Sequence, residues 1–509
     1  MKKLLIFVVL AACLLTGCGT QPGGGADGSQ TTSGSGGGGD VTPRGGPLVY
    51  AGNYAYLGTG TDAGFYFLKN VWNSNQLNIT YVDYATQKHV YLCSNLSCAH
   101  NDDSCTSYVD ANAGGASIMA VGDKLLVFYQ GMMGYEGTPA VLPRIDMMDL
   151  NGANRKTLIQ LGEQESLDYS AMHDGENAYF VRSTLISETT ESVDYRRELV
   201  RVSLASGALE TICGLEGWSY FTGAEGREIY LQSFEEAEGT IDQDKLQALE
   251  ERMQTMYADP EAYTDEDFAA VESDYSAIYE EAQGEERIIM QLLNVDSGEK
   301  QQLNTWKRKE MEDSWYLMPD GIYYVENELG VLKKKDIATG EAVVVTDKLP
   351  KHAANDEAFN NYYIGGVYTK WMFLDYSQQE GELYTTGRLA VNRQSGEVKE
   401  MTMRPDVAYL SGLVANGGVR PLLDDAPAAP AIPHVVFTNG GWGTDPVQII
   451  TEVGDRFLVI SGYDIRTEMY DGKVGELYPV EVETPIYALI TQDDYVNSRP
   501  NYINVEFIE

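Results

Sequence analysis

The hexapeptide Val295-Asp296-Ser297-Gly298-Glu299-Lys300 is followed forty-odd residues later by a second of the same type, Asp336-Ile337-Ala338-Thr339-Gly340-Glu341. Similar hexapeptides occur at 203–208 and 392–397, and looser copies at 83–88 and 149–152. A glycine after Ser or Thr supplies the positive φ angle that a tight antiparallel hairpin requires. These copies therefore predict a series of β-hairpins along the chain.

A short aromatic or β-branched segment, bounded by Gly or Asp, goes with each of these hairpins. The segments are 64–67, 122–128, 175–180, 227–231, 320–325, 370–374 and 454–459. Their composition and boundaries predict strands. They recur about every 50 to 60 residues apart from two gaps near 90, a period typical of β-propeller blades. We predict an all-β chain folded as a propeller of seven blades, with six or eight blades, or two β-sandwiches, as alternatives.

The two ends of the propeller sequence are less regular. The last hairpin copy, near Asp493, is the most degraded. The segment 502–507 reads as a strand, and we expect it to complete the ring by pairing with Leu48-Val49-Tyr50.

The first long gap carries a helical pattern. Apolar residues recur at spacings of three and four within 240–286, and Thr264 with Asp267 forms a capping-box sequence. We predict an α-helical hairpin inserted into blade four, rich in Asp and Glu, that acts either as a solvated insertion or as an arm that docks a partner. The second gap, 404–433, contains several prolines and predicts a long surface loop.

Composition excludes some classes of protein. The chain has 509 residues, 36 Lys plus Arg and 76 Asp plus Glu, for a formal net charge of −40. Such a charge argues against binding to nucleic acid and against electrostatic docking on anionic lipid. A hydrophobic content of 43% is enough for a sizeable core and excludes general disorder.

The N-terminal segment predicts export. Two lysines precede an apolar stretch of about a dozen residues, too short to span a bilayer but typical of a signal peptide. It ends in Leu15-Thr16-Gly17-Cys18, which resembles the bacterial lipobox and implies lipidation of Cys18. We predict a signal peptide at 1–17, a Gly/Ser-rich tether at 18–47 and an ectodomain at 48–509 on the outer face of the cell membrane. The alternative is an ordinary signal peptide with a chance cysteine.

Three of the remaining cysteines share one loop with a histidine. Cys93, Cys98, His100 and Cys105 lie within 13 residues, and Cys213 is separate. Three thiolates and an imidazole form a tetrahedral ligand set for which zinc is the usual ion, and a site closed by four protein ligands would be structural. Disulfides are the rival interpretation in an exported protein, and free thiols the third.

The lipobox, the tether, the Tyr-rich blades and the Cys-x4-Cys-x-His-x4-Cys loop together resemble uncharacterised propeller lipoproteins of Gram-positive bacteria of the Firmicutes type, distantly similar to TolB-like propellers. The resemblance implies a surface lipoprotein and a propeller fold, and it implies no reaction.

Motifs for known chemistries are absent from the sequence. It contains no Gly-x-Ser-x-Gly elbow, no phosphate-binding Gly-x4-Gly-Lys motif and no His-Glu-x2-His pair. We therefore expect no catalytic residues and a monomeric binding scaffold for a protein, peptide or glycan, with Trp442, Tyr362 and Tyr363 as candidate ligand contacts. The alternative is a polysaccharide-active hydrolase or lyase that uses carboxylates in the funnel. A structural role in envelope assembly, through the acidic insertion, is a third hypothesis.

Overall fold

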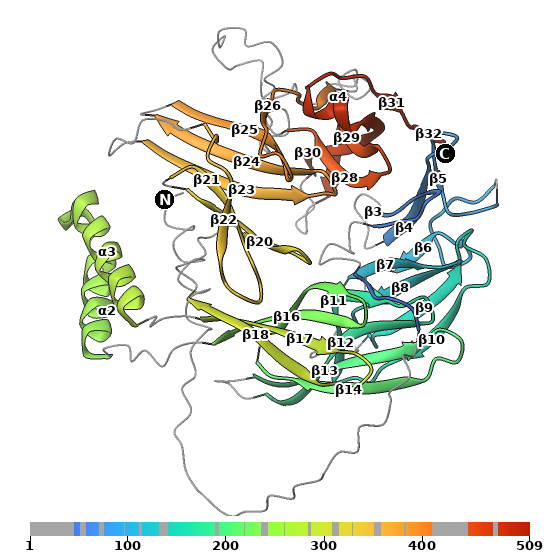
Figure 1. Cartoon of the computed structure of the whole chain (residues 1–509), viewed down its shortest axis with the longest axis horizontal. Coiled ribbons are helices and arrows are strands. Elements are labelled where there is room, and N and C mark those ends of the chain that lie inside the picture. Colours follow the sequence, from blue (N-terminus) through green and yellow to red (C-terminus); the bar gives the residue numbers. More distant parts are fainter. Residues whose placement is uncertain are drawn as a thin grey trace, which may run out of the picture.

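The computed structural model contains seven antiparallel sheets arranged as the blades of a β-propeller (Figure 1). It describes residues 45–508 except 51–57, 71–75, 96, 111–114, 132–140, 189–192, 218, 236–242, 259, 283–286, 308–314, 328, 351–357, 381–382, 410–445 and 472–476. The predicted signal peptide, nearly all of the predicted tether, Trp442 and most of the loop 404–433 lie outside the described residues. No helix in the described part of the chain is long and apolar enough to cross a bilayer.

Blade 1 contains β2 (Thr59–Gly60), β3 (Gly64–Asn70), β4 (Gln76–Asp83) and β5 (Lys88–Tyr91), with β6 (Tyr108–Asp110) beside β4. Blade 2 contains β7 (Ala116–Val121), β8 (Lys124–Tyr129), β9 (Arg144–Asp149) and β10 (Lys156–Gln160). Blade 3 contains β11 (Glu165–His173), β12 (Asn177–Glu188), β13 (Val193–Ser203) and β14 (Leu209–Leu215). Blade 4 contains β15 (Ser219–Glu225), β16 (Glu228–Glu235), β17 (Arg287–Asn294) and β18 (Lys300–Lys307).

Blade 5 contains β19 (Trp315–Met318), β20 (Gly321–Glu326), β21 (Val331–Lys335) and β22 (Ala342–Thr346). Blade 6 contains β23 (Ala358–Val367), β24 (Trp371–Glu380), β25 (Leu383–Asn392) and β26 (Val398–Met401). Blade 7 contains β28 (Gln448–Val453), β29 (Arg456–Asp471), β30 (Leu477–Thr491) and β31 (Ile503–Asn504), with β27 (Asp406–Tyr409) parallel to β29. The prediction of a seven-bladed propeller is confirmed, and each of the seven predicted segments contributes to the second strand of its blade.

The hydrophobic core is divided among the interfaces between blades. A cluster of buried apolar side chains fills each of the seven interfaces, including the one between blades 7 and 1. In that last cluster, Phe65 and Phe67 of β3 pack against Leu458 of β29 and Leu489 of β30. Because blade 7 packs on blade 1 in the same way as every other neighbouring pair, the sheets form a closed ring, which excludes two separate sandwiches.

The predicted hairpins connect the third and fourth strands of their blades. In three of the hairpins that contain glycine, at Asn294, Asp336 and Asn392, the side-chain oxygen accepts hydrogen bonds from the two N–H groups two and three residues later. The glycine that follows has a positive φ, as at Gly396, where φ is 67°. A Cβ at Gly396 would also lie 2.3 Å from the Val345 carbonyl oxygen of blade 5. Glycine is thus required both by the turn and by the packing on the preceding blade.

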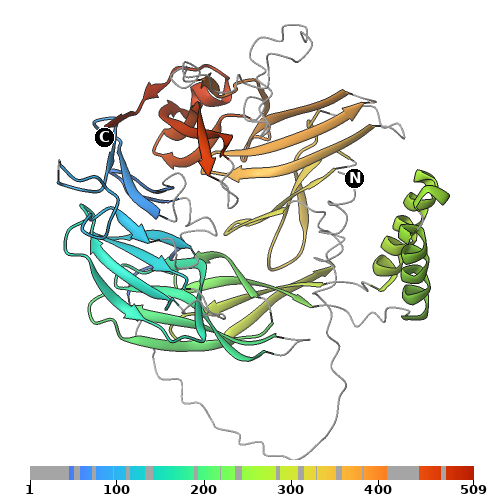
Figure 2. The same ribbon diagram turned by 180° about the vertical axis from the view of Figure 1, so that it is seen from behind.

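The C-terminus closes the ring at its outer edge, where the C-terminal end of the chain lies beside β5 (Figure 2). Strand β31 pairs with β30 of blade 7, and β32 (Glu506–Ile508) pairs in parallel with β5 of blade 1. The prediction that this segment pairs with 48–50 is wrong. Strand β1 (Val49–Tyr50) instead pairs with β11 of blade 3, because Leu48 is buried in the apolar cluster between blades 3 and 4.

The predicted helical hairpin is confirmed between the second and third strands of blade 4. Helices α2 (Gln243–Ala258) and α3 (Asp265–Ala282), linked through the short 3-10 helix η2 (Pro260–Ala262), stand apart from the sheets (Figures 1 and 2). The predicted capping box forms, since the Thr264 hydroxyl accepts from Asp267 N–H and the Asp267 carboxylate accepts from Thr264 N–H. The last hairpin copy is replaced by a helix, α4 (Gln492–Val496), capped by Thr491.

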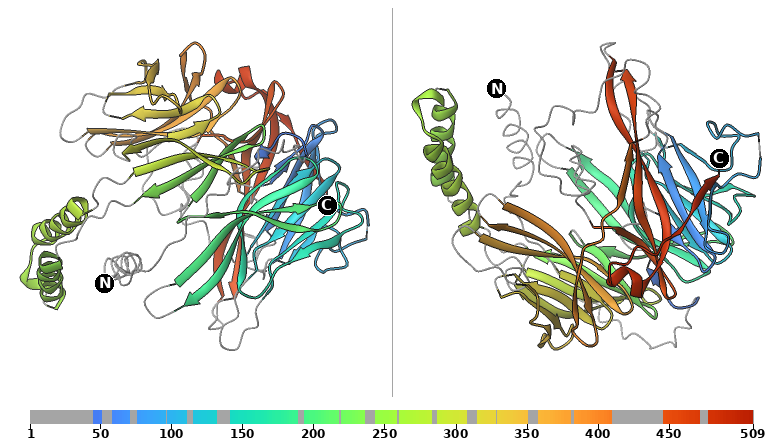
Figure 3. Two further views of the ribbon diagram at one scale, coloured as in Figure 1. Left: turned by 60° about the horizontal axis from the view of Figure 1, so that its bottom comes forward. Right: turned by 90° about the horizontal axis from the view of Figure 1, so that it is seen from above.

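The two ends of the propeller differ. In an antiparallel four-stranded blade, the 1–2 and 3–4 connections lie at one end, and the 2–3 and 4–1 connections at the other. The 1–2 and 3–4 connections are short turns, apart from the one that contains α4, and we call the end where they lie the short-turn end. The opposite end, the insertion end, carries α2 and α3, the long β12–β13, β24–β25 and β29–β30 hairpins, and the 93–105 loop. Figure 3 shows the β29–β30 hairpin projecting beyond its neighbours.

The chain enters the ring at the short-turn end. Gly46 N–H donates to the Asp174 carbonyl, and Leu48 N–H donates to the Gly226 carbonyl. Both acceptors belong to turns that join first and second strands. Strand β1 then runs antiparallel to β11, away from these turns.

Candidate metal centre

The 93–105 loop is shaped by local hydrogen bonds between the end of β5 and the start of β6. Asn95 accepts from Ser97 N–H, and Asp102 accepts from Ser104 N–H. The Thr106 hydroxyl donates to the Leu92 carbonyl at 2.7 Å and ties the end of the loop back to its beginning. His100 adopts a left-handed conformation, with φ of 57°, which folds the loop inward. Short polar side chains thus replace regular secondary structure here.

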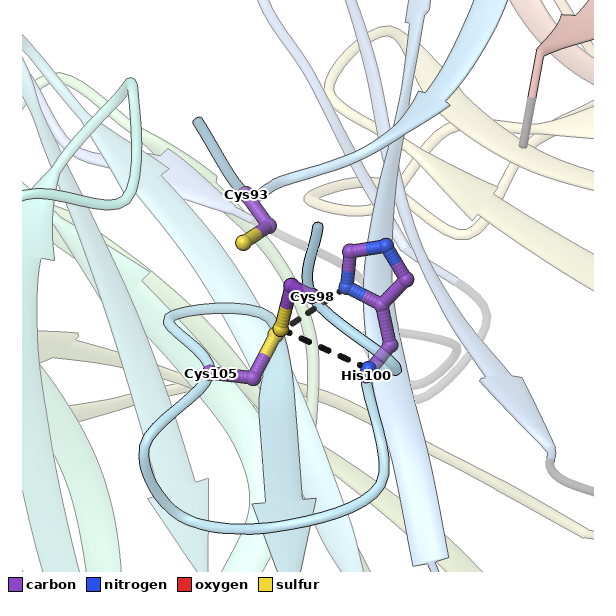
Figure 4. A group of neighbouring side chains, drawn as sticks. All are labelled: Cys93, Cys98, His100 and Cys105. Carbon is purple, nitrogen blue, oxygen red and sulfur yellow. Dashed lines mark hydrogen bonds between the residues drawn. The ribbon is translucent and has the colours of Figure 1, made fainter. Parts of the chain in front are cut away.

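The loop brings four ligand atoms together. The sulfur atoms of Cys93, Cys98 and Cys105 and one imidazole nitrogen of His100 all lie within 4.8 Å of one another. His100 Nδ1 lies 3.2 Å from Cys105 Sγ, and His100 N–H donates to Cys98 Sγ at 3.4 Å (Figure 4). The structure therefore brings together all four residues of the predicted loop cluster.

The distances suit a tetrahedral ion. Zinc–sulfur bonds of about 2.3 Å place the ligand atoms of a tetrahedral site about 3.8 Å apart. Since the four ligand atoms already lie within 4.8 Å of one another, side-chain rotation within the loop would be enough to close the shell. The cluster could hold a metal ion, and its three sulfur donors favour the softer divalent ions.

The thiols differ in acidity. Burial, only partly offset by hydrogen bonding with Ser107, raises the pKa of the Cys105 thiol to about 11. The partial burial of Cys93 acts in the same direction, but hydrogen bonds with the Asn95 backbone and with the other two cysteines lower its pKa overall. Opposite shifts of neighbouring thiols arise when one thiolate is stabilised by the protons of the others.

Groups outside the cluster orient two of the ligands. Ser107, which is fully buried, places its hydroxyl 3.0 Å from Cys105 Sγ and 3.0 Å from Asn78 Oδ1 of β4. On the other side, the Tyr91 ring stacks on the His100 imidazole with centroids 4.2 Å apart. Such outer partners fix the orientation of metal ligands.

The fourth cysteine candidate, Cys213, is not part of this cluster. Cys213 lies on β14 of blade 3, in partial contact with the apolar cluster between blades 3 and 4, and burial raises the pKa of its thiol. All four cysteines in the described part of the chain are free thiols, and none forms a disulfide there.

The candidate ligand contacts separate into different environments. Tyr362 is fully buried in the cluster between blades 5 and 6, with its hydroxyl bonded to the Pro350 carbonyl, so it is a core residue and not a surface contact. Its neighbour Tyr363 points to the opposite face of β23 and is 47% exposed.

Two further exposed tyrosines were missed by the sequence analysis. Tyr220 of β15 and Tyr316 of β19 are 44% and 40% exposed, and like Tyr363 they belong to the first strand of a blade. The first strands of neighbouring blades 4, 5 and 6 lie side by side around the axis of the ring. Among 34 tyrosines, no local signal distinguishes these from core residues; the strand position within a blade would have been needed.

Comparisons with known proteins support no family assignment. No family model matches the chain, and no curated protein matches its sequence. Among solved structures, an oligogalacturonate lyase in complex with manganese aligns with a TM-score of 0.37 and 12% identity, over 87% of this chain and 90% of that one. An ulvan lyase of polysaccharide lyase family 25 aligns with a TM-score of 0.34 and 8% identity, over 70% of this chain and 86% of that one. A chain from a nidogen/laminin complex aligns with a TM-score of 0.26 and 9% identity, over 56% of this chain and 77% of that one. At these scores the likenesses transfer no activity to this chain.

Proposed function

We propose that this chain is an exported lipoprotein whose propeller is a binding scaffold, with a structural zinc ion bracing the 93–105 loop. The lipobox at Cys18 and the Gly/Ser-rich tether support anchoring to the outer face of the membrane. The resemblance to lipoproteins of Gram-positive bacteria supports the same location. In this proposal the scaffold binds its ligand without chemical conversion.

The observation that carries the proposal is that the N-terminal segment and the insertions lie at opposite ends of the ring. The tether leads into the segment 45–50, which is hydrogen-bonded to the short-turn end. The insertions lie at the other end. A lipid at Cys18 would therefore place the short turns toward the membrane and leave the insertion end facing outward, where a large ligand can reach it.

The exposed inner-strand tyrosines are the proposed contacts for this ligand. Tyr220, Tyr316 and Tyr363 each belong to the first strand of a blade, which places all three at the inner edge of neighbouring blades. The Asn361 amide donates to the Tyr363 hydroxyl, which orders that ring. Aromatic faces with polar edges suit the stacking of sugar rings or of peptide side chains, and we favour a glycan or peptide ligand.

A panel of cell-wall glycans and peptides tests the binding function. The wild-type ectodomain is expected to bind at least one class, and the triple variant Tyr220→Ala, Tyr316→Ala, Tyr363→Ala to lose at least tenfold in affinity. Tyr195→Ala is the matched control, because Tyr195 is equally exposed but lies on the third strand of blade 3. Equal binding by the triple variant and the wild type would refute the tyrosine site.

The zinc ion is proposed as structural because the four protein ligands fill a tetrahedral shell and leave no position for water or substrate. A Cys98→Ser variant is expected to lose the ion and to lower the melting temperature of the propeller. If instead the zinc content were unchanged in Cys98→Ser, the four-ligand assignment would be wrong.

A further inference from the structure

The strand that closes the ring lies directly beside the candidate metal loop. Strand β32 pairs in parallel with β5, with Phe507 opposite His89 and Ile508 opposite Val90. Strand β5 ends at Tyr91, two residues before the first cysteine of the loop. Strand β32 therefore lies along the side of the same short strand whose end leads into the metal ligands.

Aromatic contacts connect His100 to β32. The His100 imidazole stacks on the Tyr91 ring at 4.2 Å, and the Tyr91 ring meets Phe507 edge to face at 5.5 Å. Lys69 Nζ lies 4.0 Å from the centre of the Phe507 ring and 5.3 Å from that of Tyr91, so one ammonium group contacts both rings. A shift of the His100 imidazole thus changes the surface on which Tyr91 packs, and Tyr91 in turn contacts Phe507.

The contacts continue from β32 to blade 7. The Phe507 ring lies 4.8 Å from the His89 imidazole, which meets the Tyr487 ring of β30 edge to face at 5.3 Å. Tyr487 also stacks on Phe67 of blade 1 at 4.6 Å. One series of rings therefore runs from a metal ligand, across the ring-closing strand, into the interface between blades 7 and 1.

We propose that metal binding at Cys93, Cys98, His100 and Cys105 is coupled to closure of the ring through Tyr91 and Phe507. The proposal rests on the metal site proposed above and assigns it a role. A bound ion fixes the orientation of the His100 imidazole, which gives Tyr91 a fixed face to stack on, and Tyr91 in turn holds Phe507 and β32 against β5. Tyr91 and Phe507 are positioning residues for the metal site.

Coupling of this kind is reciprocal. If the ion stabilises β32 on β5, then β32 must strengthen the binding of the ion by the same factor. An aromatic pair contributes enough to change an equilibrium constant by about 2- to 10-fold. This range is the expected size of the effect of removing the Phe507 ring.

The first arm of the test measures zinc affinity in the mature chain from residue 18, with Cys18→Ser to leave out the lipid. Competition with a chromophoric chelator compares the wild type with Phe507→Ala and with Phe507→Leu, which keeps apolar bulk but has no ring. Ile508→Ala is the matched control, because Ile508 is the exposed neighbour of Phe507 on the same strand. We expect both Phe507 variants to bind zinc about 2- to 10-fold more weakly and Ile508→Ala to bind like the wild type.

The second arm measures hydrogen exchange of the peptide that contains residues 503–508, with zinc and with a chelator. Zinc is expected to slow exchange there in the wild type and less so in Phe507→Leu. Cobalt(II) spectra check that the ligand set is unchanged in every variant.

The outcomes separate the two proposals. Equal zinc affinity in all variants, with exchange at 503–508 insensitive to zinc, would overturn the coupling while leaving the metal site intact. A wild-type chain that binds neither zinc nor cobalt would remove the metal site itself, and the coupling with it.

Discussion

Arg227 connects blades 3 and 4 through a buried ion pair. Arg227 of blade 4 bonds to Asp174 of blade 3 at 2.9 Å and to Asp296 at 2.7 Å, and its other partners are Tyr179 and the Gly46 carbonyl. The Asp174 side chain is fully buried. Although burial acts to raise it, hydrogen bonds from Tyr179 and Arg227 lower the pKa of Asp174 overall. The sequence gives no sign of this network, because its members are far apart in the chain.

Replacing Arg227 is expected to be strongly destabilising. Arg227→Met removes the guanidinium that contacts two buried carboxylates, which costs about 3–5 kcal/mol of unfolding free energy. Arg196→Met is the control, since Arg196 is mostly exposed and its loss should cost less than about 1 kcal/mol. Urea denaturation measures both variants. Similar losses in the two would show that the buried network does not stabilise the blade 3–4 interface.

His89 is expected to make stability depend on pH. Burial and the nearby Lys69 lower the pKa of His89 to about 4, against about 6.5 in the unfolded chain. Between these values the unfolded chain binds the proton and the folded chain does not, so stability falls as pH decreases from 6.5 to 4, by about 3 kcal/mol in all. Denaturation at pH 7, 5.5 and 4 should show that His89→Leu loses less stability than the wild type over this range. Parallel curves would contradict the assignment.

Among the elements, the hairpins and helices could be predicted from the sequence, whereas the pairing of the terminal strands could not. The Asn294 and Asn392 turns are local, since the side-chain cap and the glycine lie within five residues of sequence. The capping box at Thr264 is local for the same reason. Strand β1 has two residues, and its contacts with blades 3 and 4, among them the burial of Leu48, decide where it pairs. Likewise, the four ligands of the metal loop could be found from their spacing in the sequence. Tyr220 and Tyr316 could be identified as exposed only once their strands were known to be the first of their blades.

The helical insertion is expected to be an independent element. Glu235 and Arg287, on either side of it, are paired in register, so a short Gly/Ser turn can join β16 to β17. Met256, Val271 and Ile278 are its buried apolar residues, and α2 and α3 pack on each other. Replacing 236–286 by such a turn should remove helical signal from the circular dichroism spectrum and change the melting temperature by only a few degrees. Global unfolding would show instead that the insertion is required for the ring.

At the scale of the whole molecule, the fold depends on the closure between blades 7 and 1. Truncation after residue 502 removes β31 and β32, exposes the cluster around Val505 and should cost about 2–4 kcal/mol of unfolding free energy. Ile503→Ser, at an exposed position of the same segment, should have little effect. Equal stability of the truncated and full chains would mean that the C-terminal strands are not the closing element.

We propose that the 93–105 loop holds one metal ion and that this ion braces the closed ring. Native mass spectrometry of the chain from residue 18, with Cys18→Ser and purified without reductant or chelator, tests it most directly. The predicted result is a mass increased by one zinc ion in the wild type and not in Cys105→Ser. A mass lower by two hydrogens would indicate a disulfide, and the mass of the bare reduced chain would indicate free thiols; either would contradict a metal centre in this loop.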